Sequence, residues 1–261
     1  MKTNPGIKAL VLIASLLLLI PISKSWYSFL ARTIFYDELL KYKILTKSTA
    51  AVSECRFSEI ENYSILKKVH INGIDYTVTC IGNSAFKYCS SLKNIEIPES
   101  AKHNRTFYYC SHLTNIEFPA TIKSIGNSAF KGCTSLNNIK IPAGVISIER
   151  GAFWGCSSLE NIEIPENVTS ISFSVFKNCS SLTNIEIPTN IFSIGFSAFE
   201  NCSNLTSIEI PKSVIFIGHS AFAGCNNLNV VIDNSKDSVK IEEDAFKECK
   251  SVRYTRLIVD D

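Results

Sequence analysis

Eight cysteines recur at an almost constant spacing, and this spacing limits the possible folds more than any other feature. Successive members lie 21, 23, 23, 23, 23, 23 and 24 residues apart: Cys89, Cys110, Cys133, Cys156, Cys179, Cys202, Cys225 and Cys249. A phenylalanine stands three residues before each one, and a leucine or, in the last unit, a valine stands three residues after it. Three apolar positions kept in step through eight units predict a repeat protein whose units stack on one another.

The first half of a unit is predicted to be a β-strand with one buried face. Ile162 and Ile164 alternate with Asn161 and Glu163, which is the period of a strand. Pro165 has no backbone N–H to donate to a ladder, so it ends the strand. We therefore expect the two isoleucines to be buried and the two polar residues to face solvent.

The second half of the unit is predicted to contain a short extended stretch and a helical turn. Val168 and Ile171 begin the extended stretch. Ala152, Phe153 and Cys156 show the spacing of apolar residues on one face of a helix, for one turn or two at most. Each unit is therefore expected to run as strand, corner, short strand and helical turn.

A single unit of this kind is too small to fold alone. Ordering its backbone costs about 1–2 kcal/mol for each residue, whereas burying one apolar side chain contributes roughly 1.5–3 kcal/mol. Stacked units share ladder hydrogen bonds and close a continuous core. The predicted fold class is a mostly β solenoid of eight stacked repeats over residues 81–249, with a parallel sheet from Leu92 to about Ile232.

The repeat also resembles a known family. Its pattern is Leu-x-x-Ile-x-Ile-Pro followed by Val-x-x-Ile-Gly-x-x-Ala-Phe-x-x-Cys-x-x-Leu, and residues 195–205 and 208–211 show it clearly. Over residues 81–252 the chain is similar to the BspA-like leucine-rich repeat of surface proteins. The resemblance implies a right-handed leucine-rich-repeat solenoid, export to a cell surface, a role in adhesion or recognition, and no catalytic residues to carry over.

Two units depart from the family pattern. Residues 101–106 lack the Val-x-x-Ile-Gly core, so we expect a local kink there. The last unit has Val-Val-Ile-Asp at residues 230–233 in place of Ile-x-Ile-Pro.

The segments that flank the repeats are expected to act as caps. Residues 67–80 form two alternating runs across Asn72-Gly73, which predicts a β-hairpin over the open edge of the first repeat. Residues 250–261 are expected to supply a cap strand at the other end. Residues 26–66 cannot be assigned a fold, although residues 39–45 suggest a helix.

Residues 1–25 have the three-part plan of a secretory signal. Lys2 and Lys8 precede an apolar run over residues 9–22, and small residues then mark a possible cleavage site before Trp26. The run is shorter than the about 20 residues that a membrane span needs. The alternative is an uncleaved anchor formed by residues 7–22, since Trp26 and Tyr27 suit a membrane interface.

The sequence contains no motif for catalysis, metal or cofactor binding that we could identify. A net charge of +2 gives no electrostatic reason to expect nucleic acid as a partner. The four histidines form no constellation with a nucleophile, so the chain is not expected to be an enzyme. The regular cysteines stand a full repeat apart, which favours buried packing over a zinc site. Cys55 and Cys80 lie outside the series and are the candidates for a disulfide.

Two surfaces are candidates for binding a protein partner. The preferred one is a cluster of apolar residues at positions where other repeats are polar: Phe173, Phe192, Phe196, Ile215 and Phe216, with His219 beside them. These side chains mark either a contact site or packing under a flank. The alternative is the polar face of the sheet, either as a solvated surface or as an acidic groove: Asn94, Glu96, Asn115, Glu117, Asn161, Glu163, Asn184, Glu186 and Glu209.

The function predicted from these features is that of an exported, non-catalytic protein that presents a surface for protein binding, in cell-surface adhesion or recognition. The alternative is a structural or envelope protein that residues 7–22 hold in the membrane, with the solenoid as a spacer. The membrane is expected to be contacted only through the N-terminal segment.

Overall fold

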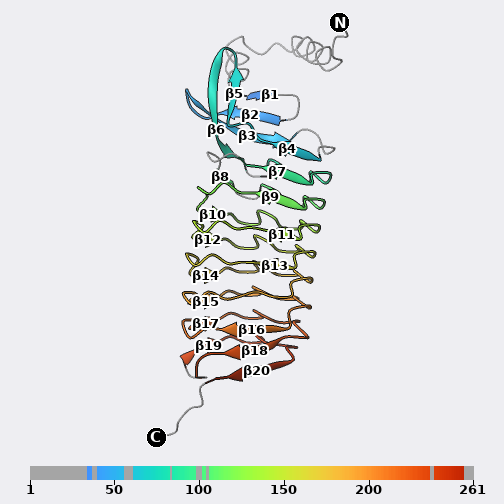
Figure 1. Cartoon of the computed structure of the whole chain (residues 1–261), viewed down its shortest axis with the longest axis vertical. Helices are drawn as coiled ribbons and strands as arrows, with labels where there is room; N and C mark the ends of the chain where they lie inside the picture. Colours follow the sequence, from blue (N-terminus) through green and yellow to red (C-terminus); the bar gives the residue numbers. More distant parts are fainter. Residues whose placement is uncertain are drawn as a thin grey trace, which may run out of the picture.

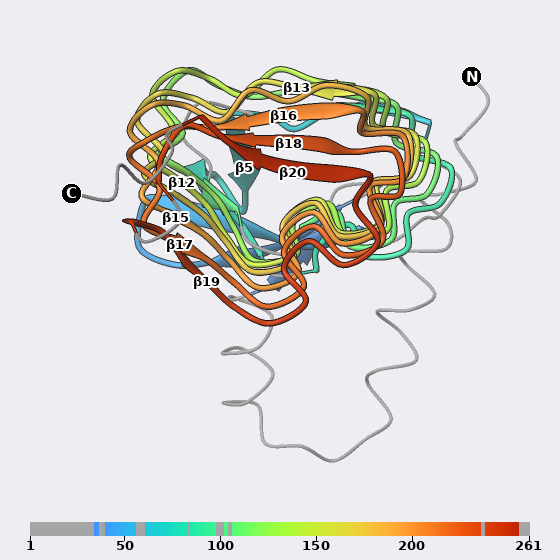
Figure 2. The same ribbon diagram turned by 90° about the horizontal axis from the view of Figure 1, so that it is seen from below.

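The computed structural model describes residues 34–36, 40–55, 61–82, 84–97, 102–103, 106–235 and 238–255. The chain winds into a stack of similar coils (Figure 1), and the coils superpose when they are viewed along the stack (Figure 2). This confirms the predicted solenoid. Residues 1–33, which include the predicted signal, lie outside the described range, and within that range no helix is long and apolar enough to cross a membrane.

The first strand of each unit builds one long surface, which we call the sheet face. Neighbouring strands pair in parallel and at equal positions, as Asn138 does with Asn161 and Ile139 with Ile162. Ile162 is buried, whereas Asn161 and Glu163 are exposed, so the predicted register is confirmed. The strands of this face are β4 (Asn62–Ser64), β7 (Asn94–Glu96), β9 (Asn115–Glu117), β11 (Asn138–Ile139), β13 (Asn161–Ile162), β16 (Ser207–Ile210), β18 (Asn229–Ile232) and β20 (Ser251–Tyr254).

The second short strands stack on another side of the coils, which we call the lateral face. They also pair in parallel, as Ser170 does with Ser193 and Ile171 with Ile194. The isoleucines point into the core, which they share with those of the sheet face. The strands are β8 (Lys102–His103), β10 (Ser124–Ile125), β12 (Ser147–Ile148), β14 (Ser170–Ile171), β15 (Ser193–Ile194), β17 (Phe216–Ile217) and β19 (Lys240–Ile241).

The third side of each coil, the turn face, differs from the prediction. The expected helical turn is wrong, because hydrogen-bonded turns replace it and no helix occurs in the part of the chain that the structure describes. Two residues in the left-handed conformation, such as Ser128 (φ 51°) and Gly132 (φ 75°), bound the turn in one coil. A residue at positive φ cannot continue a right-handed helix. The N–H of Cys133, the residue after Gly132, donates to the carbonyl of Phe130 at 3.0 Å, which closes a tight turn instead.

The ladder phenylalanines stack through the centre of the solenoid. The Phe153 ring lies 5.5 Å from that of Phe130 and 5.7 Å from that of Phe176, with the planes inclined by 7° and 5°. All three side chains are fully buried. The stack explains why each unit repeats a phenylalanine at this place, since each ring packs against the rings of its two neighbours.

The cysteine ladder beside these rings holds free thiols that bond between coils. The Cys156 thiol donates to the carbonyl of Phe130 at 3.2 Å, and that oxygen also accepts the N–H of Cys133. Equivalent bonds link each ladder cysteine from Cys110 to Cys249 with the preceding coil. Cysteine suits this position because it is small and apolar yet carries a donor.

The candidate disulfide between Cys55 and Cys80 is not formed, because both are free thiols. Cys80 lies opposite Ala51 in the parallel pair of strands. Cys55 instead hydrogen-bonds the Cys89 side chain, and this contact raises the pKa of Cys89. Cys55 therefore stands next to the first ladder thiol.

The hairpin predicted across Asn72-Gly73 is present. Strands β5 (Lys68–Ile71) and β6 (Ile74–Ile81) run antiparallel, and the two turn residues have φ values of 50° and 81°, as a two-residue hairpin turn requires. The sheet continues past the hairpin, because the strand order is β1-β2-β3-β6-β5: β3 (Thr49–Cys55), β2 (Leu40–Ile44) and β1 (Ile34–Tyr36) follow β6 on the side away from β5.

The helix suggested for residues 39–45 is wrong. The described part is β2, which pairs antiparallel with β3 (Thr49–Cys55). Leu40 and Tyr42 are buried, whereas Lys41 and Lys43 are more exposed, so the apolar residues follow the period of a strand.

Parallel pairing extends beyond the predicted sheet at both ends. Strand β3 pairs parallel with β6, and β4 pairs parallel with β7, so coil-like pairing begins before Leu92. At the other end β20 pairs parallel with β18 and continues the sheet. Residues 256–261 of the predicted cap strand lie outside the described residues, and so do residues 101, 104 and 105 of the predicted kink.

Burial should make the ladder thiols unreactive. It raises the pKa of Cys179 to about 12 and that of Cys156 well above its usual value, and the thiolate is the reactive form. We expect a thiol reagent to leave Cys156 unmodified in the native protein and to modify the half-buried Cys80 first, as peptide mass analysis would show. Cys156→Ala should lower the free energy of unfolding by about 1 kcal/mol or more, and Cys80→Ala by less. Rapid labelling of the whole native ladder would contradict a buried position.

Candidate functional site

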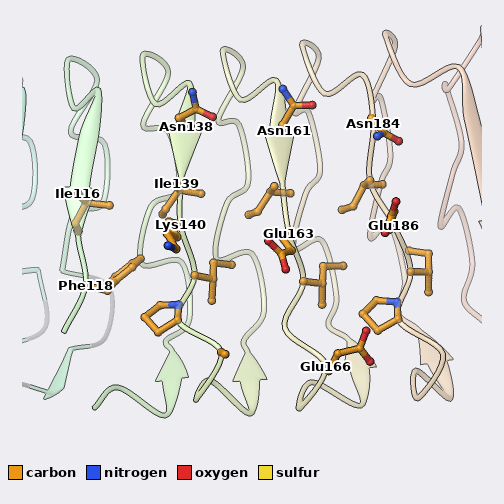
Figure 3. Close-up of a pocket in the computed structure, with 18 of the residues that line it drawn as sticks. Ile116, Phe118, Asn138, Ile139, Lys140, Asn161, Glu163, Glu166, Asn184 and Glu186 are labelled. Carbon is orange, nitrogen blue, oxygen red and sulfur yellow. The ribbon is translucent and has the colours of Figure 1, made fainter. Parts of the chain in front are cut away.

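A long groove lies on the sheet face (Figure 3). It has a volume of about 1280 Å³ and spans the strands that carry residues 115–189. Asn138, Asn161 and Asn184 form one row along it, and Lys140 interrupts a second row of glutamates (Figure 3). Every residue of the predicted polar stripe is exposed on this face: Asn94, Glu96, Asn115, Glu117, Asn161, Glu163, Asn184, Glu186 and Glu209.

The electrostatics of the groove are mild. Adjacent strands lie about 4.8 Å apart, so neighbouring carboxylates such as those of Glu163 and Glu186 repel by roughly 0.9 kcal/mol in water. Among the described residues Lys140 forms no ion pair. The face repeats nearly the same polar groups from coil to coil, which suits a solvated surface and gives a specific partner few distinguishing contacts.

The predicted apolar cluster lies on the lateral face, in the three adjacent coils that carry β14, β15 and β17. The exposed fractions of Phe173, Phe192, Phe196 and Ile215 are 48%, 49%, 41% and 59%. The rings of Phe173 and Phe196 stack at 5.0 Å with an angle of 3°, and the half-buried Phe216 ring lies 6.1 Å from that of Phe196. We call these five residues the lateral patch.

Two glycines explain how these rings lie so close to the coils. A Cβ at Gly195 would come within 2.7 Å of the Phe173 ring, and one at Gly218 would collide with the Phe196 ring. Each ring therefore rests on the bare backbone of the next coil. The sequence pattern identified the aromatic residues. The packing of each ring against a glycine could not be predicted, because it depends on how adjacent coils are aligned.

The polar neighbours of the lateral patch are few. His219 is exposed on the same face, and its carbonyl accepts the N–H of Ser197 at 3.0 Å. The ammonium of Lys240 lies 5.6 Å from the centre of the Phe216 ring. A smaller pocket of about 440 Å³ opens on this face and is lined in part by Phe173, Phe216 and Arg150. The patch thus combines rigid aromatic surface with a partly polar rim.

A third row of side chains, which was not predicted from the sequence, lies on the turn face. The residue that directly follows each of the first six ladder phenylalanines is, in successive coils, Lys87, Tyr108, Lys131, Trp154, Lys177 and Glu200. The signal was present as an alternation of lysine and aromatic residues at one repeat position. This alternation is visible only when successive coils are compared, because each coil alone has an ordinary surface residue at this position.

The fold and these surfaces define a β-solenoid repeat protein that offers three differently composed faces to solvent. The model of the BspA type leucine-rich repeat region matches in six copies, at residues 28–126, 102–229 and 217–258. These matches span most of the chain, including the coil-like strands before residue 81. The chain belongs to the BspA-type leucine-rich-repeat family.

Solved structures similar to this chain are also leucine-rich-repeat proteins. A leucine-rich cell surface protein from Faecalibacterium prausnitzii has 29% identity and a TM-score of 0.68, over 78% of this chain and 55% of that one. A leucine-rich-repeat protein from Bacteroides ovatus has 25% identity and a TM-score of 0.68, over 84% and 70%. One from T. pallidum has 26% identity and a TM-score of 0.53, over 79% and 85%.

The match therefore spans just over half the length of the F. prausnitzii protein. No curated protein in the comparison matches this sequence.

Proposed function

We propose that this protein is a non-catalytic recognition module of a cell surface, and that it binds a protein partner through the lateral patch. The observation that carries the proposal is the exposure of four large apolar side chains, two of them with stacked rings, on one face of a rigid solenoid. Protein interfaces are rich in rigid aromatic anchors, and isolated exposed apolar patches of this kind mark contact sites.

The lateral patch fits this role better than the sheet face. Its residues differ from their counterparts in other coils, such as Lys123 and Asn127, so they give the surface one distinct place. Burying five such side chains in an interface would contribute several kcal/mol, at roughly 1.5–3 kcal/mol for each fully buried one. The Asn and Glu rows offer mostly polar groups that are already hydrated.

The proposed location rests on two supports. The similar F. prausnitzii protein is described as a cell surface protein, and residues 1–25 have the pattern of a secretory signal. Mass analysis of the mature N-terminus distinguishes a cleaved signal from an anchor. A chain that begins at Trp26 supports secretion, and an intact Met1 in the membrane fraction supports anchoring by residues 7–22.

Changing Phe192 and Phe196 together to Ser should reduce protein-dependent adhesion about tenfold or more while the solenoid stays folded. Both rings are about half exposed, so their loss removes binding surface with little core packing. The measurement is the adhesion of protein-coated beads to cultured epithelial cells, before and after protease treatment of the cell surface. Circular dichroism and thermal unfolding check the fold.

Ile74→Ser is the matched control, because Ile74 is 48% exposed but lies in the hairpin. It should leave adhesion unchanged. Adhesion that resists protease, or that is equal for the parent and the double variant, would reject the proposed role of the patch. Unfolding of the double variant would show that the rings belong to the core.

A further inference from the structure

The turn face carries a second distinctive row of side chains, which does not include the residues of the lateral patch. Cations and aromatic rings alternate along it from coil to coil, and we call Lys87, Tyr108, Lys131, Trp154 and Lys177 the turn stripe. The Lys131 ammonium lies 3.4 Å from the centre of the Trp154 ring and 5.7 Å from that of Tyr108. Lys87 lies 5.5 Å from the Tyr108 ring, and Lys177 lies 5.6 Å from the Trp154 ring. The alternation is therefore continuous in space.

The charge of the turn stripe is only partly compensated. Lys177 forms an ion pair with Glu200 at 2.7 Å. Within the described residues neither Lys87 nor Lys131 forms an ion pair. Lys87 is exposed and Lys131 is half-buried beside rings that shield it from water. The N-terminal part of the stripe thus carries net positive charge next to aromatic faces.

Two further tyrosines widen this part of the stripe, and both hold a strained backbone. Tyr88 and Tyr109 have φ values of 60° and 59°, and their side chains are 57% and 42% exposed. A bulky residue rarely adopts this conformation. The equivalent positions of later coils hold mostly glycine or asparagine: Gly132, Gly155, Asn178, Asn201 and Gly224.

The fold imposes this conformation, because the N–H at the position bonds the next coil. The Tyr109 N–H donates to the carbonyl of Lys131 at 2.7 Å, and that of Gly132 donates to the carbonyl of Trp154 at 2.8 Å. Glycine would meet the same requirement without strain. Two exposed tyrosines are therefore retained where the fold favours glycine, and strain of this kind clusters at functional sites.

The spacing of the stripe selects the chemistry of its ligand. Adjacent coils lie about 4.8 Å apart, so lysines in every second coil recur at about 10 Å. Sugars in an extended polysaccharide advance by nearly one coil spacing each, so one sugar would meet each coil. Residues of an extended peptide advance by about 3.3 Å, so every third residue would meet a lysine but none would fall at the aromatic coil about 4.8 Å further on.

We propose that the turn stripe binds a linear acidic polysaccharide in which charged sugars alternate with neutral ones. The carboxylates of the charged sugars would pair with Lys87 and Lys131. The apolar C–H faces of the neutral sugars would stack on Tyr108 and Trp154. Tyr88 and Tyr109 add aromatic surface at the N-terminal end of the stripe, where their ring centres lie 5.7 Å apart.

Titration of the full chain with hyaluronan oligosaccharides tests the proposal, because uronate and neutral sugars alternate in that polymer. We expect saturable binding that weakens as salt rises and that strengthens with chain length until the oligosaccharide spans the stripe. Lys131→Ala should weaken binding about tenfold, which corresponds to about 1.4 kcal/mol, and Lys131→Arg should largely restore it. Lys212→Ala, an exposed lysine outside the stripe, is the matched control.

Tyr88→Gly and Tyr109→Gly separate recognition from folding. Glycine relieves the left-handed strain, so the thermal midpoint should stay equal or rise while the affinity for hyaluronan falls several-fold. If the two tyrosines only stabilised the fold, their replacement would lower the thermal midpoint and the affinity for hyaluronan together. The Phe192 and Phe196 double variant should bind hyaluronan like the parent, so this test is independent of the lateral patch.

Three results would overturn the proposal. The first is no binding of hyaluronan by the parent chain. The second is equal binding of polyglutamate or single-stranded DNA, which would indicate nonspecific attraction of polyanions. The third is binding of neutral N-acetylglucosamine oligomers by the parent chain as tightly as hyaluronan, which would remove charge from the recognition.

Discussion

Phe153→Ala should lower the free energy of unfolding by about 3–5 kcal/mol. The Phe153 side chain is fully buried, and its ring stacks on those of Phe130 and Phe176 in the neighbouring coils. Truncation removes the apolar contacts of a whole ring and opens a cavity in the middle of the stack. Urea denaturation followed by circular dichroism measures the change.

Phe192→Ala provides the comparison, because the Phe192 side chain is 49% exposed in the same solenoid. Its cost should stay near 1 kcal/mol or less. The Phe153 variant should also broaden the transition or split it in two, since coils contact only their neighbours and a weak coil separates the two halves. A loss of less than about 1 kcal/mol for Phe153→Ala would show that the ring stack is not the core of the fold.

Ile162→Asp should destabilise the protein by more than about 4 kcal/mol at neutral pH. Ile162 is only 6% exposed, so the change removes an apolar side chain from the core and places a carboxyl there. Asn161→Asp puts the same group one position along the strand, where the side chain is exposed. That control should change stability by no more than about 0.5 kcal/mol.

The loss caused by Ile162→Asp should depend on pH. Burial raises the pKa of the introduced carboxyl in the folded state above its value of about 3.9 in the unfolded chain. The unfolded state then releases its proton first as pH rises, so stability falls between the two pKa values. Denaturation at pH 4 and pH 7 should therefore show partial recovery at the lower pH. Equal behaviour of the two variants would contradict the strand register.

The solenoid and its register were predictable from the sequence because both depend on local patterns. Ile162 and Ile164 alternate with polar residues, and a strand with one buried face has only one way to place them. The hairpin across Asn72-Gly73 was predictable for a similar reason, since the turn type needs residues that tolerate positive φ. At residues 39–45 a short apolar run was assigned the wrong period, and pairing with β3 decides in favour of a strand.

The sequence by itself therefore determined the period of this protein, the buried and exposed sides of its strands, and the residues of the lateral patch. Only the tertiary structure decided which groups meet between coils, because stacking brings together residues about 23 positions apart. The thiol of Cys156 donates a hydrogen bond to the carbonyl of Phe130, and the Phe173 ring packs against Gly195. The stacked coils also align lysines with aromatic rings on the turn face, a contact that no single unit contains.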